Sequence, residues 1–274
     1  MPIRIVQSKQ NARLKELRRA LTSPGRKAAG LVGIEGPHLL EEAMRAELQI
    51  RCVFADERMR PWVEGLELES EVDVLILPFG ILAGTLSTET PQPVAALVEP
   101  PEWNWADVLS VRAGSPALVV VLAGLQDPGN LGTIVRSAEA FGASGVVCLP
   151  GTVSPWNQKA LRASAGSVFR VPIVDADEAE AICQMRKAGV RVLTTAVEGA
   201  QAANEADLRT SVALVIGNEG NGVPAALAAQ ADAAVTIPCP GPVESLNAAV
   251  AAGVLLYEAS KQRTPKRPAS GGAQ

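Results

Sequence analysis

The sequence predicts an α/β protein whose C-terminal half is built on a parallel β-sheet. From residue 117 onward, short apolar runs alternate with segments of helical periodicity. Two of these runs, residues 118–122 and 212–216, are apolar at every position, as strands covered by helices on both faces must be. Loops rich in glycine, proline and asparagine follow the strands. In such sheets, ligands bind at the edge where the strands end.

The first hundred residues predict a smaller α/β domain. A basic amphipathic helix over residues 9–21 carries leucines at helical spacing and ends at Pro24-Gly25. After it we expect a strand over 31–35, a helix through 39–44, and strands over 51–55, 72–77 and 94–98.

The C-terminal half predicts a longer series of elements. We expect helices near residues 130–141, 155–165, 177–188 and 245–261, and strands over 117–123, 145–149, 190–195, 212–216 and 233–237. The predicted organisation is a first domain over 1–99, a proline-containing linker over 100–116, a second domain over 117–262, and a disordered basic tail over 263–274.

Composition limits the classes of protein to consider. A chain of 274 residues with 47% hydrophobic residues can bury a large core. No apolar run approaches the length of a membrane span and no signal sequence is evident, so we expect a cytoplasmic protein. The four cysteines are scattered and accompanied by a single histidine, His38, so we expect neither disulfides nor a metal site.

Charge is unevenly distributed. The net charge of −4 argues against a protein that coats nucleic acid nonspecifically. The first 27 residues nevertheless contain eight basic side chains and one acid, and the tail is also basic. These residues are either solvated surfaces or contacts to phosphates, and charge alone does not decide between the two.

Three loops carry the residue types that chemistry requires. The first, residues 125–136, contains the turn Pro128-Gly129, the possible helix cap Asn130, and Arg136, which falls outside the apolar stripe of the following helix. An arginine there is a surface residue or one that reaches the crevice at the sheet edge. The second loop, residues 217–224, has three glycines that let the backbone approach a ligand and encloses Glu219.

The third loop, residues 237–247, is stiffened by prolines and leads into an alanine-rich helix that Ser245 could cap. The glycine spacing of the second loop reverses that of a dinucleotide-binding fingerprint, which disfavours a Rossmann-type enzyme.

These loops resemble the SpoU (TrmH-like) family of RNA 2'-O-ribose methyltransferases. The resemblance rests on residues 130–136, 216–220 and 237–238 with 245–247, in the family's order and spacing, and covers residues 117–262. The stretch 156–172 also looks like this family, and residues 17–36 look like the substrate-binding domain, related to a ribosomal-protein fold, of many ribosomal RNA members. One departure is Cys239, which stands where many relatives have methionine.

The resemblance implies a C-terminal trefoil knot, a feature that periodicity could not reveal. It implies S-adenosylmethionine as methyl donor, with no metal. The implied catalytic residues are Arg136, Asn130, Glu219, Ser245 and Asn247. The implied cofactor-binding residues are Thr195, Gly217, Asn218, Ile237 and Leu246. The implied RNA-binding residues are Arg13, Arg18, Arg26 and Glu35.

The implied activity is methyl transfer to a ribose 2'-OH, with large-subunit (23S) ribosomal RNA favoured. Transfer RNA and a catalytically inactive relative that binds RNA and cofactor are the alternatives. Arg136 is implied as a general base, although a guanidinium gives up its proton with difficulty, which makes stabilisation of the developing alkoxide the chemically simpler role. The family also implies a homodimer. The helix over 245–261 is a candidate contact surface, with packing inside its own domain as the alternative.

Overall fold

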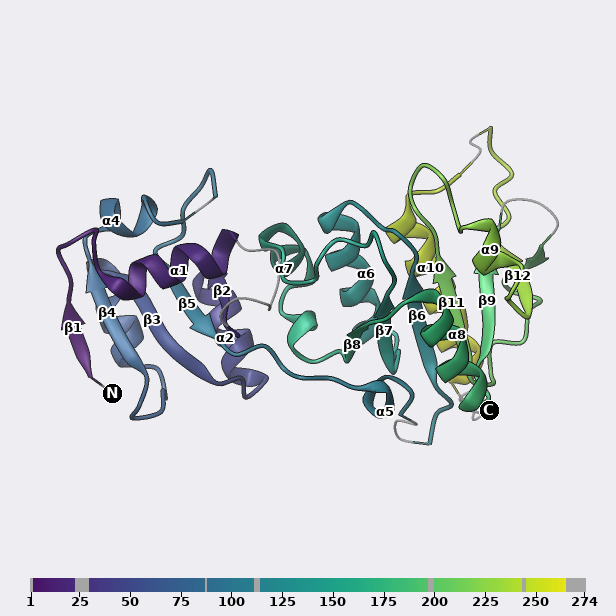
Figure 1. The fold of residues 1–274 in the computed structure, drawn as a ribbon, viewed down its shortest axis with the longest axis horizontal. Coiled ribbons are helices and arrows are strands. Elements are labelled where there is room, and N and C mark those ends of the chain that lie inside the picture. The colour runs from purple at the N-terminus through teal and green to yellow at the C-terminus, as the bar shows by residue number, and fades with distance from the viewer. Residues whose placement is uncertain are drawn as a thin grey trace, which may run out of the picture. The chain divides into compact units, whose positions relative to one another are not determined.

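The computed structural model describes residues 2–22, 30–86, 88–110, 114–196, 200–242 and 245–264. The chain forms two compact units, each built on its own sheet (Figure 1). The first unit contains Met1–Glu102 together with Leu131–Arg136 and Val153–Arg170, and the second contains Trp103–Asn130, Ser137–Thr152 and Val171–Gln274.

The first unit holds a five-stranded mixed sheet with the order β1-β4-β3-β5-β2. Its strands are β1 (Ile3–Ile5), β2 (Val32–Glu35), β3 (Ile50–Asp56), β4 (Asp73–Leu77) and β5 (Val94–Val98). Strands β1, β4 and β3 run parallel, whereas β5 is antiparallel to both β3 and β2. Every residue of β2 is buried, including Glu35.

Helices cover this sheet because each one has an apolar stripe. The first helix, α1 (Ala12–Thr22), lies across the strands in Figure 1 and buries Leu14, Leu17 and Leu21 in a cluster with Phe54 of β3. The remaining helical elements of the N-terminal segment are α2 (Pro37–Arg45), η1 (Glu57–Met59), α3 (Arg60–Glu64) and α4 (Phe79–Ala83). The predicted basic amphipathic helix is therefore present.

The first unit also includes α7 (Gln158–Ser164) and η2 (Ser167–Phe169). The side-chain amide of Gln158 donates to the carbonyl oxygen of Gly33 in β2 at 2.7 Å. Gly132 comes so close to α7 that a Cβ atom there would lie 2.4 Å from the carbonyl oxygen of Ala160. Only glycine allows this close packing.

The second unit holds a seven-stranded sheet in which all neighbouring strands run parallel, with the order β10-β12-β9-β11-β6-β7-β8. The strands are β6 (Leu118–Leu122), β7 (Gly145–Cys148), β8 (Ile173–Asp175), β9 (Arg191–Thr195), β10 (Gln201–Ala202), β11 (Val212–Ile216) and β12 (Ala233–Thr236). The central strands β6 and β11 are buried at every position, as the sequence predicts.

Helices cover this sheet as a parallel sheet requires. The short helices α5 (Trp105–Val108) and α9 (Ala225–Ala228) and the longer α8 (Glu178–Lys187) share one core with alternate residues of β6 and β11. The other helices are α6 (Pro128–Ala140) and α10 (Ala248–Arg263). The packing of α10 on β11 is close, and Phe141 meets Tyr257 edge to face at 5.9 Å.

Several elements differ from the sequence expectations. Strands β1, β8 and β10 were not expected, because two or three residues show no periodicity. The expected linker over 100–116 contains α5, whose Asn104 and Asp107 form a reciprocal capping box and whose Val108 is fully buried. This part of the segment is therefore folded into the second unit.

Arg263 also differs from expectation, since residue 263 was predicted to begin a disordered tail. It is the last residue of α10, and its half-buried guanidinium donates to the carbonyl oxygens of Leu208, Pro116, Ala117 and Thr210 at 2.6–3.2 Å. A cation at the end of a helix is stabilised by the helix dipole. The rest of the predicted tail, 265–274, lies outside the described residues.

Candidate functional site

Three loops of the second unit follow the strands β6, β11 and β12 of the parallel sheet, in which β9 lies between β12 and β11. Residues 123–127 follow β6, residues 217–224 follow β11, and residues 237–247 follow β12, with 243–244 outside the description. Strands β6 and β11 are adjacent and in register, with Leu122 opposite Ile216. Their loops therefore leave the sheet at the same edge, where ligands of parallel sheets bind.

Glu219 joins the second loop to the first. Its carboxylate accepts from the backbone N–H groups of Gln126 and Asp127, each at 3.3 Å, and from the side-chain amide of Asn130 at 3.0 Å. Burial alone would raise the pKa of Glu219, but these hydrogen bonds outweigh it and lower the pKa below its ordinary value. The side chain therefore stays ionised, and its charge strengthens the bonds it accepts.

Asn247 extends this arrangement to the third loop. Its side-chain amide donates to Oδ1 of Asn130 at 3.1 Å, and its own Oδ1 accepts from Ala249 N and Val250 N at the start of α10. Side chains from all three predicted motifs thus form one hydrogen-bonded series, Glu219–Asn130–Asn247, which we call the carboxylate–amide chain. In the sequence, Asn130 is 89 positions from Glu219 and 117 positions from Asn247.

Two helix caps differ from those expected. Asp127 caps α6 by accepting from Asn130 N at 2.8 Å, so the side chain of Asn130 is free to enter the carboxylate–amide chain. Asn247 caps α10, whereas Ser245 is exposed and lies outside the helix. The sequence signal for the first cap was an aspartate directly before Pro128, since proline is common at the first helical position.

The second loop is held closed by its own backbone and by Asn218. Asn218 and Gly222 exchange two backbone hydrogen bonds of 2.9 Å. The side chain of Asn218 accepts from Gly220 N and Asn221 N and donates to the carbonyl of Gly124 at 2.8 Å. A Cβ atom at Gly217 would lie 2.2 Å from the carbonyl carbon of Gly222, so this position requires glycine.

Arg136 lies on α6, six residues beyond Asn130 and thus between one and two turns further along the helix. It is exposed and outside the buried stripe that includes Ile134 and Val135. Within the described parts of the chain, no hydrogen bond or ion pair engages its guanidinium. Its five N–H donors are therefore available to a substrate.

Three of the residues predicted to bind a cofactor lie at the ends of three adjacent strands. Thr195 is the last residue of β9, Gly217 follows β11, and Ile237 follows β12, in the sheet order β12-β9-β11. The Thr195 hydroxyl donates to the carbonyl of Val215 at 3.0 Å. Leu246 directly precedes the cap of α10 and, like Ile237, is half-buried.

A cavity of about 340 Å³ opens at the ends of β6, β7 and β11. It includes Asn218 but none of the other four residues predicted to bind the cofactor.

The predicted RNA-binding residues have different surroundings. Arg13 is ion-paired with Glu16 at 2.9 Å and with Asp73 at 3.2 Å, and Arg18 donates to the carbonyl of Gly84. Arg26 lies outside the described residues. Glu35 is only 3% exposed. The sequence did not indicate that this carboxylate would be buried.

Three further features of the described residues are the cysteines, the possible metal ligands and the length of the helices. All four cysteines are free, and burial raises the pKa of the Cys52 and Cys148 thiols, which favours the protonated form of these two. The described residues contain no group of three histidine, cysteine or acidic side chains placed to hold a metal ion. Among the same residues, no helix has both the length and the apolar character needed to cross a membrane.

The fold and these loops together define an α/β protein with three loops gathered at the carboxyl edge of a parallel sheet, preceded by a mixed α/β segment with its own sheet. Residues 117–257 match the SpoU rRNA methylase family, and residues 11–96 match the MRM3-like substrate binding domain. The chain belongs to the SpoU rRNA methylase family. This confirms the family and the fold class that the sequence predicts, whereas the knot remains a prediction.

Relatives match along nearly the whole chain. A Bacillus subtilis protein named 23S rRNA (guanosine(2553)-2'-O)-methyltransferase RlmP is 34% identical over 92% of this chain and 97% of its own. The AdoMet-bound rRNA methyltransferase of Sinorhizobium meliloti has a TM-score of 0.85 at 30% identity, covering 96% of this chain and 99% of that one. The SpoU methyltransferase AviRb of Streptomyces viridochromogenes, in complex with AdoMet, has a TM-score of 0.80 at 29% identity, covering 93% and 98%.

Proposed function

We propose that this protein transfers a methyl group from S-adenosylmethionine to a ribose 2'-OH of 23S ribosomal RNA. The observation that carries this proposal is the carboxylate–amide chain, in which Glu219, Asn130 and Asn247 draw the three family motifs together. The RlmP relative, similar over nearly the whole length of both chains, supports ribosomal RNA as the substrate. A transfer RNA substrate and an inactive RNA-binding protein are the alternatives.

The reaction places a weak nucleophile in line with an electrophilic carbon. S-adenosylmethionine supplies a methyl group on a sulfonium; the ribose oxygen forms the new bond to carbon while the carbon–sulfur bond breaks and sulfur keeps the electron pair. The protein must hold the reacting atoms about 3–3.5 Å apart. The carboxylate–amide chain serves this purpose by fixing the start of α6, the helix that carries both Asn130 and Arg136.

We assign to Arg136 the stabilisation of the ribose oxygen while the hydroxyl proton passes to solvent water. A guanidinium keeps its proton at neutral pH, so it donates hydrogen bonds to the developing alkoxide and to a neighbouring phosphate more readily than it accepts a proton. Its exposure and its lack of partners in the described structure support this role.

The residues proposed to hold the methyl donor fit an adenosyl group chemically. Ile237 and Leu246 are half-buried aliphatic side chains that can contact a flat purine, and the loops around Gly217 bring backbone donors and acceptors to the same edge. Thr195, Asn218 and Ser245 are the proposed polar neighbours. Asn218 would act by shaping the second loop, since its side chain already makes three contacts within the protein.

The N-terminal domain is proposed to bind the RNA. Arg13 and Arg18 on α1, together with Arg26 at a later position in the sequence, are the proposed RNA contacts, because arginine is well suited to phosphate contacts. We also propose a homodimer, because Val250, Val254 and Tyr257 are 40–55% exposed at helical spacing on α10. With ribosomal RNA as substrate, the proposed location is the cytoplasm.

The test replaces Arg136 with alanine. Methyl transfer from labelled S-adenosylmethionine to ribosomal RNA should fall at least about 100-fold, because one donor to a developing oxyanion contributes that much. Cofactor affinity, measured by calorimetry, should stay within about threefold of the unmodified protein. Methylated positions are mapped as alkali-resistant linkages, which report the 2'-O position directly.

The matched control is Arg209→Ala, which removes an exposed arginine that pairs only locally with Asp207. It should methylate at the normal rate. An Arg136→Ala protein that methylates as fast as this control would refute the assigned role, and absence of alkali-resistant linkages with the unmodified protein would refute the activity.

A further inference from the structure

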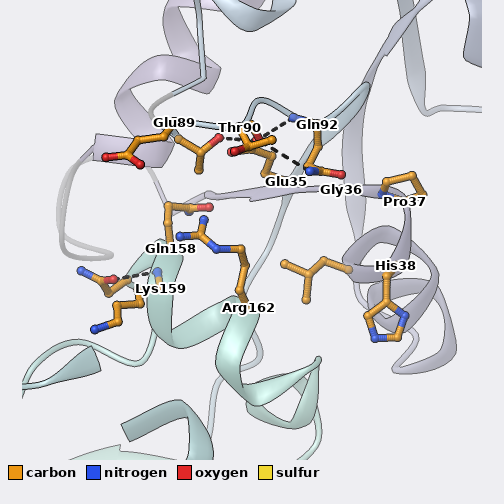
Figure 2. Close-up of a pocket in the computed structure, with 13 residues that line it drawn as sticks. Glu35, Gly36, Pro37, His38, Glu89, Thr90, Gln92, Gln158, Lys159 and Arg162 are labelled. Carbon is orange, nitrogen blue, oxygen red and sulfur yellow. Dashed lines mark hydrogen bonds between the residues drawn. The ribbon is translucent and has the colours of Figure 1, made fainter. Parts of the chain in front are cut away.

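The first unit contains a cavity of about 690 Å³ whose lining includes no residue of the three family loops. It lies where β2 meets α2, and it is completed by the 88–92 segment and by the start of α7 (Figure 2). Cavities of this size accommodate small organic ligands, including a single nucleotide. None of the residues assigned to methyl transfer lines it.

Two residues that line the cavity, Glu35 and Gln158, each carry a buried hydrogen-bond acceptor that has no partner among the described residues. Glu35 is 97% buried: its Oε1 accepts from the Thr88 hydroxyl at 2.6 Å and from Gln92 N at 2.9 Å, but its Oε2 has no partner within the described residues. Gln158 donates its side-chain amide to the carbonyl of Gly33, which leaves its buried Oε1 equally unpaired. Buried polar atoms are nearly always paired, so these two indicate a ligand that donates hydrogen bonds.

The rest of the lining suits an anion. Arg162 on α7 is exposed, and its guanidinium makes no ion pair or hydrogen bond with any described residue. The side chain extends toward Gln158 and Glu35 in Figure 2. The nine-residue helix α2 begins at this cavity, and its cap is Gly36, which has no side chain to satisfy the first N–H groups. A guanidinium and an uncapped helix start are both good partners for a phosphate.

We propose that this cavity binds one guanine nucleotide of the RNA substrate, with its base splayed out of the strand. Guanine is the one standard base whose Watson–Crick edge carries two neighbouring donors, N1–H and the 2-amino group. Adenine and cytosine would each place a ring acceptor against one of the two protein acceptors, and uracil would place carbonyls there. The base therefore meets Glu35 and Gln158, while its phosphate meets Arg162 and the start of α2.

This inference deepens the proposed function, since it takes RNA to be the substrate. It assigns to Glu35 the recognition of a base rather than a contact to the RNA backbone. A carboxylate would repel a phosphate, whereas it binds a guanine edge well.

The test measures binding of fluorescently labelled five-nucleotide RNAs of uridine with a central guanosine, inosine, adenosine, cytidine or uridine. Guanosine should bind at least about tenfold more tightly than adenosine, cytidine or uridine. Inosine, which lacks the 2-amino group, should fall between guanosine and the others. Equal binding of all five RNAs would overturn the proposal.

Two variants test whether the guanosine preference arises in the cavity. Glu35→Gln keeps the shape but replaces the unpaired acceptor with an N–H donor, so the guanosine preference should vanish while the melting temperature shows that the protein is folded. The matched control is Glu89→Gln, the same change at an exposed residue of the cavity rim, and it should keep the full preference. A preference that survives in Glu35→Gln would contradict the assignment.

Three further measurements test the phosphate contact, distinguish RNA from a free nucleotide as the ligand, and distinguish base recognition from catalysis. Arg162→Ala should weaken all five RNAs by a similar factor and reduce the salt dependence of binding by about one charge. Guanosine monophosphate should compete only weakly; if it binds more tightly than the guanosine RNA, the ligand is a free nucleotide and the RNA assignment is wrong. Arg136→Ala protein should keep the guanosine preference, so loss of methyl transfer and loss of base reading are distinguishable.

Discussion

Glu219 and Asn130 show how single side chains connect distant parts of the chain. Glu219 alone accepts three hydrogen bonds from the first loop, and Asn130 passes the connection on to Asn247. Hydrogen bonds to an ionised group are stronger than neutral ones, and the lowered pKa of Glu219 keeps it charged at neutral pH. The position of the first loop therefore depends on a carboxylate more than 80 residues away in the sequence.

This dependence predicts coupling between the two residues. Glu219→Gln places an amide donor among N–H donors and should lower kcat/KM for methyl transfer by about 10–100-fold, the equivalent of roughly 1.4–2.8 kcal/mol. Asn130→Ala should do the same, and the double variant should be little worse than either single one. A double-mutant cycle on kcat/KM measures the coupling.

Strictly additive losses in that cycle would show that the two side chains act independently. Glu205→Gln, at an exposed acidic residue outside the site, serves as the control and should leave kcat/KM unchanged.

The sequence predicted which residues belong to the site more readily than it predicted which hydrogen bonds each of them makes. The grouping of Asn130, Glu219 and Asn247 was inferred from the family resemblance, and these side chains do meet. The caps were assigned to the wrong neighbours, because Ser245 and Asn247, or Asn130 and Asp127, are equally good cap residues by type. Only the backbone geometry at the start of each helix decides which of them accepts from the first N–H groups.

At the scale of elements, long and strongly patterned segments were predictable and close contacts were not. The strands β6 and β11 follow directly from continuous apolar runs. Periodicity does not show that α6 approaches α7 so closely that Gly132 is required, because that contact depends on tertiary packing. The burial of Glu35 in β2 was missed for the same reason.

An ion-pair cluster connects α2 to the segment after η2. The side chain of Glu42, only 10% exposed, pairs with Arg170 at 2.6 Å and also with Arg45. Burial alone would raise the pKa of Glu42, but the hydrogen bonds and charges of Arg170 and Arg45 outweigh it, so the pKa is lowered. The charged form of Glu42 is therefore favoured by folding.

This cluster predicts a pH dependence of stability. Glu42→Gln should lower the free energy of unfolding by about 1–3 kcal/mol at pH 7. Because the folded pKa lies below the unfolded value of 4.5, the contribution is complete above about pH 5 and is lost as the pH falls through the folded pKa. Urea unfolding at pH 7 and at pH 3.5 should show the difference between variant and parent shrinking at the lower pH.

The matched control for this comparison is Glu64→Gln, which removes an exposed carboxylate that pairs with Arg60 on the surface. It should change stability by less than about 0.5 kcal/mol at either pH. A Glu42→Gln difference that stays constant or grows on acidification would contradict the assigned ion-pair role.

At the scale of the whole molecule, sequence pattern predicted two α/β domains but not the strand order. The order β10-β12-β9-β11-β6-β7-β8 places β9 and β11 next to each other, with β12 on the far side of β9. Periodicity identifies strands without saying which are neighbours. The path of the chain through the predicted knot depends on threading, which local patterns do not encode.

The surface of α10 leads to the last prediction, which concerns assembly. Val250, Val254 and Tyr257 are exposed at spacings of four and three residues, so they lie on one face of the helix. Small helical residues between them allow a second helix to approach closely.

Val254→Glu would place a charge in the centre of this face and should convert a dimer into a monomer in light scattering, with an unchanged circular dichroism spectrum. Ala226→Glu, which adds the same charge at an exposed position of α9, should remain dimeric. A Val254→Glu protein that is still dimeric, or a parent protein that is monomeric at micromolar concentration, would exclude this face as the dimer interface.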